Sequence, residues 1–223
     1  DVGILQGESW PVSPPVGYVR LTQFSERTSA ELEEALQTVE RQGAQGLVLD
    51  LRNNPGGLLT SALEVASKFL EGGPIVHIVG RDHEKQTLLA FPRAAHSSLP
   101  LVVLVNGYSA SASEIVSGAL QDRGVATVVG ERTFGKGLVQ VVIPMRDGSA
   151  LSLTSARYQT AGGRFIHEKG VEPDIEVKLG EDELEILELE STAPNPADPQ
   201  LRKALEVLQA KIRIHAGELK LAG

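Results

Sequence analysis

The strongest structural signal in the sequence lies in residues 46–57, which read GLVLDLRNNPGG. The run at 47–51 is apolar apart from one aspartate and shows no alternation with polar residues, which is typical of a β-strand covered on both faces. After the Gly-Gly pair, apolar residues recur at helical spacing from Leu59 to Leu70. The stretch therefore predicts a buried strand, a glycine-rich loop and a helix.

The same pattern returns further along the chain. Residues 101–105 and 125–129 are again short apolar runs, and the small and apolar residues at 112–122 between them favour a helix. Buried strands that alternate with helices predict an α/β fold with a mostly parallel sheet and crossover helices.

Two antiparallel hairpins are predicted beside this sheet. An Asp-Gly pair at 147–148 is a strong turn signal and lies between the apolar runs 139–143 and 150–154. Residues 75–79 and 87–91 flank a polar turn in the same way.

The ends of the chain read differently from its middle. We expect residues 1–16 to form an irregular lead-in or linker and residues 17–180 to form the core. Residues 181–223 begin as an acidic linker and end as an amphipathic helix over 199–213. We expect the apolar stripe of that helix to pack on the core, with a contact between copies, and so a homo-oligomer, as the alternative.

The first helix carries its own boundary signals. Thr28 is followed three residues later by Glu31, the spacing of a capping box. Gly43 stands where a helix commonly ends.

Composition excludes several classes of protein. The formal net charge is -8, from 21 basic and 29 acidic residues, which argues against a partner that is a nucleic acid. The chain has no cysteine, so disulfides, thiolate metal sites and cysteine nucleophiles are excluded. The 5 histidines show no metal-ligand spacing, and no apolar run is long enough to span a bilayer. The first 17 residues do not have the pattern of a signal peptide.

Three loops carry the chemistry that the sequence offers. Residues 50–57, 106–114 and 130–137 each follow a predicted buried strand. If these strands are parallel neighbours, all three loops open at the same edge of the sheet, where ligands of α/β proteins bind.

Each loop has a functional and a structural interpretation. Gly56 and Gly57 present bare N–H groups that suit an oxyanion hole, although a Gly-Gly pair alone is more often a turn. Ser111 precedes a helix, where serine is usually an N-cap. A lysine acts as a base only where burial without a counter-charge lowers its pKa, and we expect Phe134 and the flanking strands to form such a pocket for Lys136.

Other kinds of site fit the loops less well. Residues 130–137 approach a phosphate-binding Walker loop, but Gly137 replaces the required Ser or Thr and a strand follows. No G-x-S-x-G nucleophile elbow occurs. Asp50 and Arg52 are interpreted as a structural ion pair under their loop.

Taken together, the loops resemble the peptidase core of the carboxyl-terminal processing proteases, also called tail-specific proteases. The matching stretches are residues 17–21, 50–57, 108–115, 130–137 and 170–174, in the family's order. No single stretch is decisive, but the set is highly specific. The resemblance implies a crotonase/ClpP-like core.

The resemblance also implies a catalytic set. Ser111, the middle serine of Ser-Ala-Ser-Ala-Ser, matches the nucleophile, and Lys136 of Phe-Gly-Lys-Gly matches the general base. Gln140 matches a glutamine that orients the lysine. The oxyanion donors match Ala112 and either Gly56 or Gly57.

The implied activity is that of a serine endopeptidase that cleaves near the C-terminus of protein substrates through an acyl-enzyme, with no metal or other cofactor. The implied partners are proteins or peptides with free C-termini, and the implied locations are the periplasm, the cell envelope or the thylakoid lumen. Relatives usually carry a PDZ domain before the core, and we detect none in the 16 residues before the first matching strand.

Two other functions are compatible with this core. One is a non-catalytic module that binds peptide C-termini, against which the complete set of Ser111, Lys136 and Gln140 argues. The other is a thioester-processing enzyme of the crotonase type, which the serine and lysine motifs disfavour.

Overall fold

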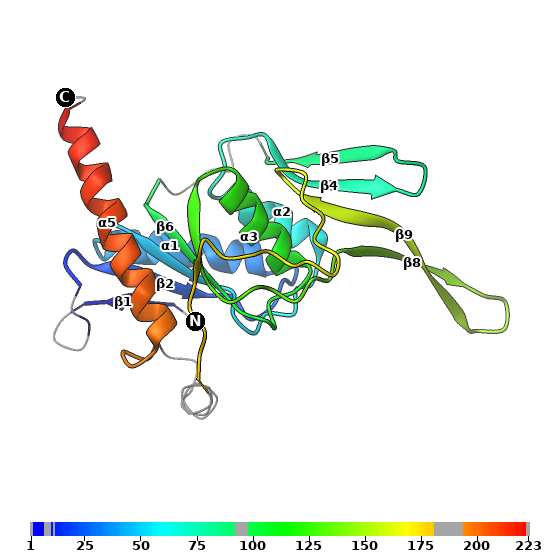
Figure 1. The fold of residues 1–223 in the computed structure, drawn as a ribbon, viewed down its shortest axis with the longest axis horizontal. Coiled ribbons are helices and arrows are strands. Elements are labelled where there is room, and N and C mark those ends of the chain that lie inside the picture. Colours follow the sequence, from blue (N-terminus) through cyan, green and yellow to red (C-terminus); the bar gives the residue numbers. More distant parts are fainter. Residues whose placement is uncertain (1, 7–9, 11, 92–97, 181–193, 222–223) are drawn as a thin grey trace.

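The computed structural model describes residues 2–6, 10, 12–91, 98–180 and 194–221 of the chain. Within these residues, the chain forms two sheets and four helices (Figure 1). The strands are β1 (Val2–Leu5), β2 (Val16–Arg20), β3 (Leu47–Asp50), β4 (Pro74–Gly80), β5 (Lys85–Leu89), β6 (Leu101–Val105), β7 (Ala126–Gly130), β8 (Leu138–Pro144), β9 (Ala150–Thr160) and β10 (Ile175–Glu176). The helices are α1 (Thr28–Arg41), α2 (Leu59–Ser67), α3 (Ala112–Asp122) and α5 (Pro199–Leu221).

The main sheet has six strands in the order β1-β2-β3-β6-β7-β10. Strands β2, β3, β6, β7 and β10 are parallel, and only β1 is antiparallel to its neighbour. The predicted α/β fold with a mostly parallel sheet and crossover helices is confirmed.

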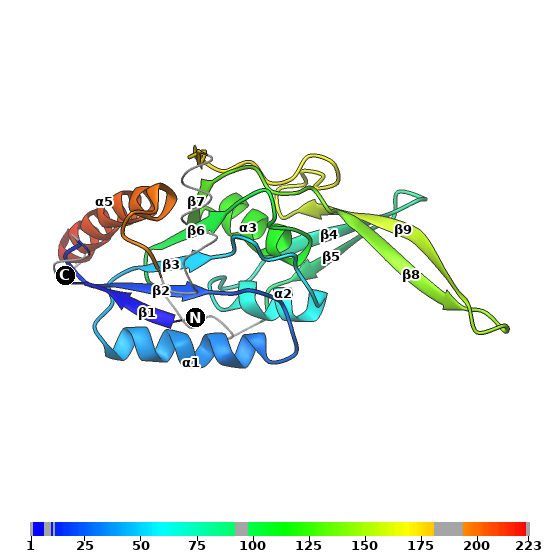
Figure 2. The same ribbon diagram turned by 90° about the horizontal axis from the view of Figure 1, so that it is seen from below.

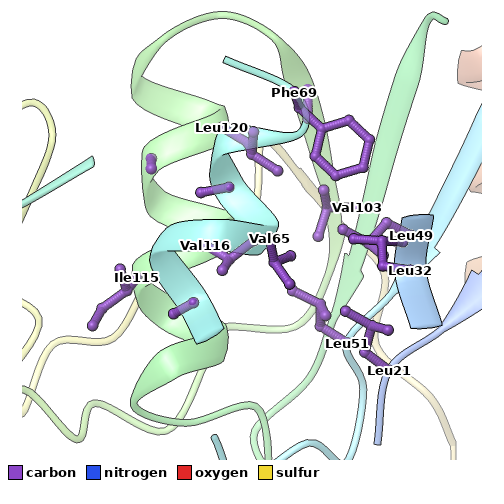
Figure 3. Close-up of a cluster of buried hydrophobic side chains, with 14 of the residues drawn as sticks. Leu21, Leu32, Leu49, Leu51, Val65, Phe69, Val103, Ile115, Val116 and Leu120 are labelled. Atoms are coloured by element: carbon purple, nitrogen blue, oxygen red, sulfur yellow. The ribbon is translucent and has the colours of Figure 1, made fainter. Parts of the chain in front are cut away.

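The sheet lies between two layers of helices, which Figure 2 shows with α1 and α5 on opposite sides. In β3, Leu47 and Leu49 belong to the core under α1, α2 and α3, whereas Val48 between them faces the other core. Successive side chains of a strand point to opposite faces, so a strand between two helical layers must be apolar throughout. Figure 3 shows the larger core, where Val65, Val116 and Leu120 of the helices meet Val103 of β6.

Helix α5 covers the second face of the sheet. Its apolar stripe (Leu201, Leu205, Leu208 and Ile212) is buried with Val48, Val102 and Leu104 of the strands. The expected packing of this stripe on the core is thereby confirmed, and the helix is longer than predicted, ending at Leu221. A homo-oligomer stays a prediction.

The second sheet is antiparallel, with the order β5-β4-β9-β8. Both predicted hairpins occur in it, β4–β5 and β8–β9. The β8–β9 hairpin extends well beyond the body of the protein (Figure 1). Its first residue, Leu138, comes two positions after Lys136.

Three details differ from the sequence-based expectations. The lead-in over 1–16 is not wholly irregular, because β1 pairs with β2 along the edge of the main sheet. Strand β10, which was not predicted, adds to β7 at the other edge. The capping box at Thr28 is absent: Arg27 is the N-cap, and the Thr28 hydroxyl donates to the Gln23 carbonyl. The predicted acidic linker at 181–193 lies outside the described residues.

Candidate active site

The three loops meet at the carboxyl edge of the main sheet. A side chain at Gly56 would place its Cβ 2.8 Å from Ser111 Cβ and 2.9 Å from the Ala112 nitrogen. Gly56 also has a φ of +102°, a conformation that favours glycine. The glycine loop therefore lies directly against the start of α3, as only a residue without a side chain allows.

Ser111 stands at the N-cap of α3 and forms a capping box with Glu114. The interpretation of Ser111 as a helix N-cap is therefore confirmed. Capping does not explain its backbone, however, because φ is +54° and ψ is -110°, whereas N-cap residues usually lie in the β region. Such strain in a residue that is not glycine is concentrated at functional sites.

The two neighbouring serines have structural roles. The Ser109 hydroxyl donates to the Leu51 carbonyl at 2.8 Å, and the Ser113 hydroxyl donates to the Asn54 carbonyl at 2.9 Å. Both side chains are buried, whereas Ser111 is partly exposed. The structure thus separates Ser111 from the other serines of its motif.

Glu114 joins the serine loop to the lysine loop. Its Oε2 accepts hydrogen bonds from Ser111 N at 2.8 Å and from Lys136 N at 2.9 Å. Its Oε1 accepts from Thr133 Oγ1 at 2.5 Å and from Gly135 N at 2.7 Å. Because one oxygen holds both backbones, the backbones of Ser111 and Lys136 are neighbours although 24 residues separate them in the chain. Within the described ranges, no hydrogen bond joins the Ser111 hydroxyl to the Lys136 amine.

The backbone N–H groups of the glycine loop are not equivalent. Gly56 N–H donates to Asn54 Oδ1 at 2.9 Å. For the N–H groups of Gly57 and Ala112, no acceptor is found in the part of the chain that the structure describes. These two donors are therefore free of acceptors among the described residues, and the Ala112 N–H directly follows Ser111 in the chain.

Lys136 is exposed, which differs from the expected pocket. Phe134 does not form a pocket around it, because Phe134 is itself 64% exposed, and Tyr108 near Ser111 is 71% exposed. Two large aromatic residues of the serine and lysine loops, Tyr108 and Phe134, are thus exposed to solvent.

Gln140 lies on β8, next to a β-bulge between Val139 and Gln140. Its side chain is exposed, and within the described ranges no hydrogen bond joins it to Lys136. The structure therefore does not connect Gln140 to the lysine that it was expected to orient.

Asp50 and Arg52 form the ion pair that the sequence suggested, with Arg52 Nη2 and Asp50 Oδ2 2.7 Å apart. Burial opposes ionisation of Asp50, but the charge and hydrogen bonds of Arg52 hold the pKa of Asp50 below its usual value. The Tyr18 hydroxyl donates to Asp50 at 2.8 Å, and burial together with the Asp50 charge raises the pKa of Tyr18.

Sequence reasoning assigned no role to Glu114, Asn54 or Asn106. A signal for Glu114 was present, since Ser111 and Glu114 have the capping-box spacing. The asparagines lie in loops without such a pattern. Among the described residues, no group of three or more His, Asp or Glu side chains has an arrangement that could hold a metal ion. In the same residues, no helix is long and apolar enough to cross a membrane.

Comparison with known proteins assigns this arrangement to a family. The model of the family described as peptidase family S41 matches residues 15–177. The chain belongs to peptidase family S41.

Two curated relatives show which kind of S41 peptidase it is similar to. The carboxyl-terminal-processing protease of Synechocystis sp. is 44% identical over 201 residues, which is 89% of this chain and 45% of the relative. The chloroplastic C-terminal processing peptidase of Tetradesmus obliquus is 44% identical over 162 residues, which is 73% of this chain and 35% of the relative. This S41 chain thus spans less than half the length of either relative.

A solved structure agrees with this placement. The photosystem II D1 C-terminal processing protease superposes with a TM-score of 0.73 and 38% sequence identity, over 80% of this chain and 48% of the other. The resemblance to carboxyl-terminal processing proteases is confirmed.

Proposed function

We propose that this chain is the catalytic core of a serine endopeptidase that cleaves near the C-terminus of protein substrates, with Ser111 as nucleophile and Lys136 as general base. The observation that carries the proposal is the single carboxylate oxygen of Glu114, which accepts from the backbone N–H of both residues. A serine and a lysine whose backbones are held side by side, at strained and glycine-lined loops, support the assignment of an activated nucleophile and its base.

The chemistry follows from the positions of these groups. The neutral amine of Lys136 takes the proton of the Ser111 hydroxyl as Ser111 Oγ bonds to the carbonyl carbon of the scissile peptide. The resulting Lys136 ammonium then gives that proton to the leaving amine as the C–N bond breaks. Water then gives a proton to Lys136 as its oxygen bonds to the ester carbon. Lys136 passes that proton to Ser111 Oγ as the ester C–O bond breaks, which releases the acyl fragment as a carboxylic acid and restores the Ser111 hydroxyl.

The negative charge of each tetrahedral intermediate needs donors that are already in place. We assign this role to the N–H groups of Gly57 and Ala112, because Gly56 N–H is occupied by Asn54. The choice between the two glycines, which the sequence left open, thus falls on Gly57.

Lys136 is exposed in the structure, so the water-poor environment that a lysine base needs has to come from the substrate. A bound polypeptide that lies over Ser111 would remove water from Lys136, and Phe134 and Tyr108 offer apolar surface for it. We propose that substrate binding completes the water-poor environment, and that Gln140 reaches Lys136 only in that state.

Substrates and location are inferred from the relatives. We propose proteins or peptides with free C-termini as substrates, as the names of the processing proteases suggest. The chloroplast and bacterial origins of the relatives fit a thylakoid lumen, a periplasm or another cell-envelope location.

Cleavage of an unfolded polypeptide, followed by intact-mass spectrometry, tests the proposal. We expect C-terminal fragments with the unaltered chain, and a loss of at least about 10³-fold in rate for Ser111→Ala and for Lys136→Ala. A Lys169→Ala variant, which changes an exposed lysine of a neighbouring loop, serves as control and should cleave normally. Near-normal cleavage by Ser111→Ala refutes the assignment, and binding without cleavage by the unaltered chain favours a non-catalytic module.

A further inference from the structure

The N-terminus of α5 is connected to the glycine loop through one largely buried arginine, Arg52. Asp198 Oδ2 lies 2.6 Å from Arg52 Nη1, although 146 positions separate the two residues. Gln200 Oε1 accepts from the same nitrogen at 3.0 Å. Asp198 and Gln200 are almost completely buried, so the contact is shielded from solvent and salt.

Asp198 uses its two carboxylate oxygens for different purposes. Oδ1 caps α5 by accepting from Gln200 N at 2.9 Å and from Leu201 N at 3.1 Å. Oδ2 is left for Arg52. The helix cap and the arginine contact are therefore separable by substitution.

Arg52 is fixed from its other side by Asp50. Arg52 Nε lies 3.0 Å from Asp50 Oδ1 and Arg52 Nη2 lies 2.7 Å from Asp50 Oδ2, a two-pronged contact of fixed geometry. The backbone N–H of Arg52 also donates to Asp50 Oδ1 at 2.9 Å. A carboxylate on strand β3 and a carboxylate on α5 thus hold one guanidinium between them.

The loop that follows Arg52 leads straight to the candidate active site. Asn53 N–H donates to Asn106 Oδ1 at 2.9 Å, and Asn106 Nδ2 donates back to Asn53 Oδ1 at 2.8 Å. Asn54, the next residue, holds Gly56 N–H with its side chain and Ala110 N–H with its carbonyl. A shift of Arg52 would therefore be passed on to both loops that flank Ser111.

We propose that Asp198 is a positioning residue for catalysis, which acts through Arg52 to fix the glycine loop and its Gly57 N–H beside Ser111. The contact of Asp198 with Arg52 is then required for the oxyanion hole to assemble, and α5 contributes to catalysis as well as to stability. This inference rests on the proposed function, because the role of the glycine loop as an oxyanion hole comes from that proposal.

Two substitutions separate the arginine contact from the helix cap. Asp198→Ser keeps a capping hydroxyl but has no atom that reaches Arg52. Asp198→Asn keeps a capping oxygen but places its amide NH2 group next to the Arg52 guanidinium. Both groups are hydrogen-bond donors, so the contact between residue 198 and Arg52 is lost. The matched control is Leu208→Val or Leu208→Ala, whichever gives the same loss of Tm, because Leu208 anchors α5 without contacting Arg52.

The first measurement is steady-state cleavage of a peptide well below the Tm of every variant. We expect kcat to fall at least about tenfold in both Asp198 variants with KM within about twofold, since misplacement of a group by 1 Å can cost ~10²-fold in rate. The Leu208 control should keep kcat. Equal kcat losses in the control and the Asp198 variants, or an unchanged kcat in both Asp198 variants, overturn the proposal.

The second measurement does not depend on peptidase activity. Backbone amide resonances of Gly56 and Gly57 should shift in Asp198→Ser and stay in place in the Leu208 control, as recorded on ¹⁵N-labelled protein by NMR. An unshifted Gly57 amide in Asp198→Ser overturns the inference whatever the rates are. If the unaltered chain cleaves no substrate, the proposed function fails, while this measurement still decides the role of Asp198.

Discussion

Ser111 and the glycines beside it show how single residues create the candidate site. The backbone of Ser111 is strained, Gly56 touches the serine, and Gly57 has a φ of +145°. The sequence identified Ser111, Lys136 and the glycine pair as candidates through the resemblance of the three loops, taken together, to one family, and their catalytic roles stay a prediction. The proposal of Gly57 rather than Gly56 as the oxyanion donor could not be made from the sequence. It depends on the Asn54 side chain, which accepts a hydrogen bond from Gly56 N–H.

Gly57→Ala tests this choice at the residue scale. A Cβ at Gly57 would lie 2.0 Å from the Phe24 carbonyl oxygen, so the loop must move and carry its N–H away from Ser111. We expect kcat to fall by about 10²–10³-fold, the usual cost of losing one oxyanion donor. The control is Gly148→Ala, since Gly148 has a φ of +85° but nothing within 4 Å of an added Cβ. Retention of full activity by Gly57→Ala contradicts the assignment.

At the scale of elements, the same sequence pattern has two different outcomes. The spacing of Thr28 and Glu31 predicts a capping box on α1, but the structure places Arg27 at the cap. The equivalent spacing of Ser111 and Glu114 forms a box on α3, where Glu114 also holds the lysine loop. Local spacing cannot distinguish the two cases, because the difference comes from the loop at 133–136, which lies far away in the sequence.

Replacement of Glu31 and of Glu114 by glutamine tests whether only Glu114 holds a second loop in place. In Glu114→Gln, an NH2 group replaces one of the two carboxylate oxygens, so the donors that bonded to that oxygen lose their acceptor. Each buried donor left without an acceptor costs ~1–3 kcal/mol. We expect Glu114→Gln to lower both the unfolding free energy and kcat. Glu31→Gln removes an exposed pair with Arg27 and should change stability by less than ~0.5 kcal/mol. Chemical denaturation and peptide cleavage check both variants, and equal effects would contradict the role given to Glu114.

At the scale of the whole molecule, three layers and the edge where the site forms follow from the strand and helix patterns. Apolar runs such as 101–105 require cover on both faces, and α3 and α5 provide it. The sequence did not reveal that Asp198 reaches Arg52, because an ion pair between residues 146 positions apart leaves no local pattern. It also did not reveal β1 and β10, which are short and lie at the edges of the sheet.

The ion pair of Asp50 and Arg52 at the end of β3 predicts a loss of stability in acid. The pKa of Asp50 is lower in the folded protein than in the unfolded chain, so its contribution is present above the unfolded value of about 3.9 and is lost as the pH falls below it. Chemical denaturation between pH 7 and pH 3 should show a smaller decline of the unfolding free energy for Asp50→Asn than for the unaltered chain. Parallel declines would show that Asp50 does not carry this dependence.

Labelling with a peptidyl fluorophosphonate measures the activation of Ser111 by Lys136 most directly, because this reagent reacts with activated serines. We expect one adduct per chain, located on Ser111 by peptide mass spectrometry. Lys136→Ala should react at least about 10²-fold more slowly, in line with the usual contribution of a general base. An adduct on another residue, or equal rates with and without Lys136, would contradict the account.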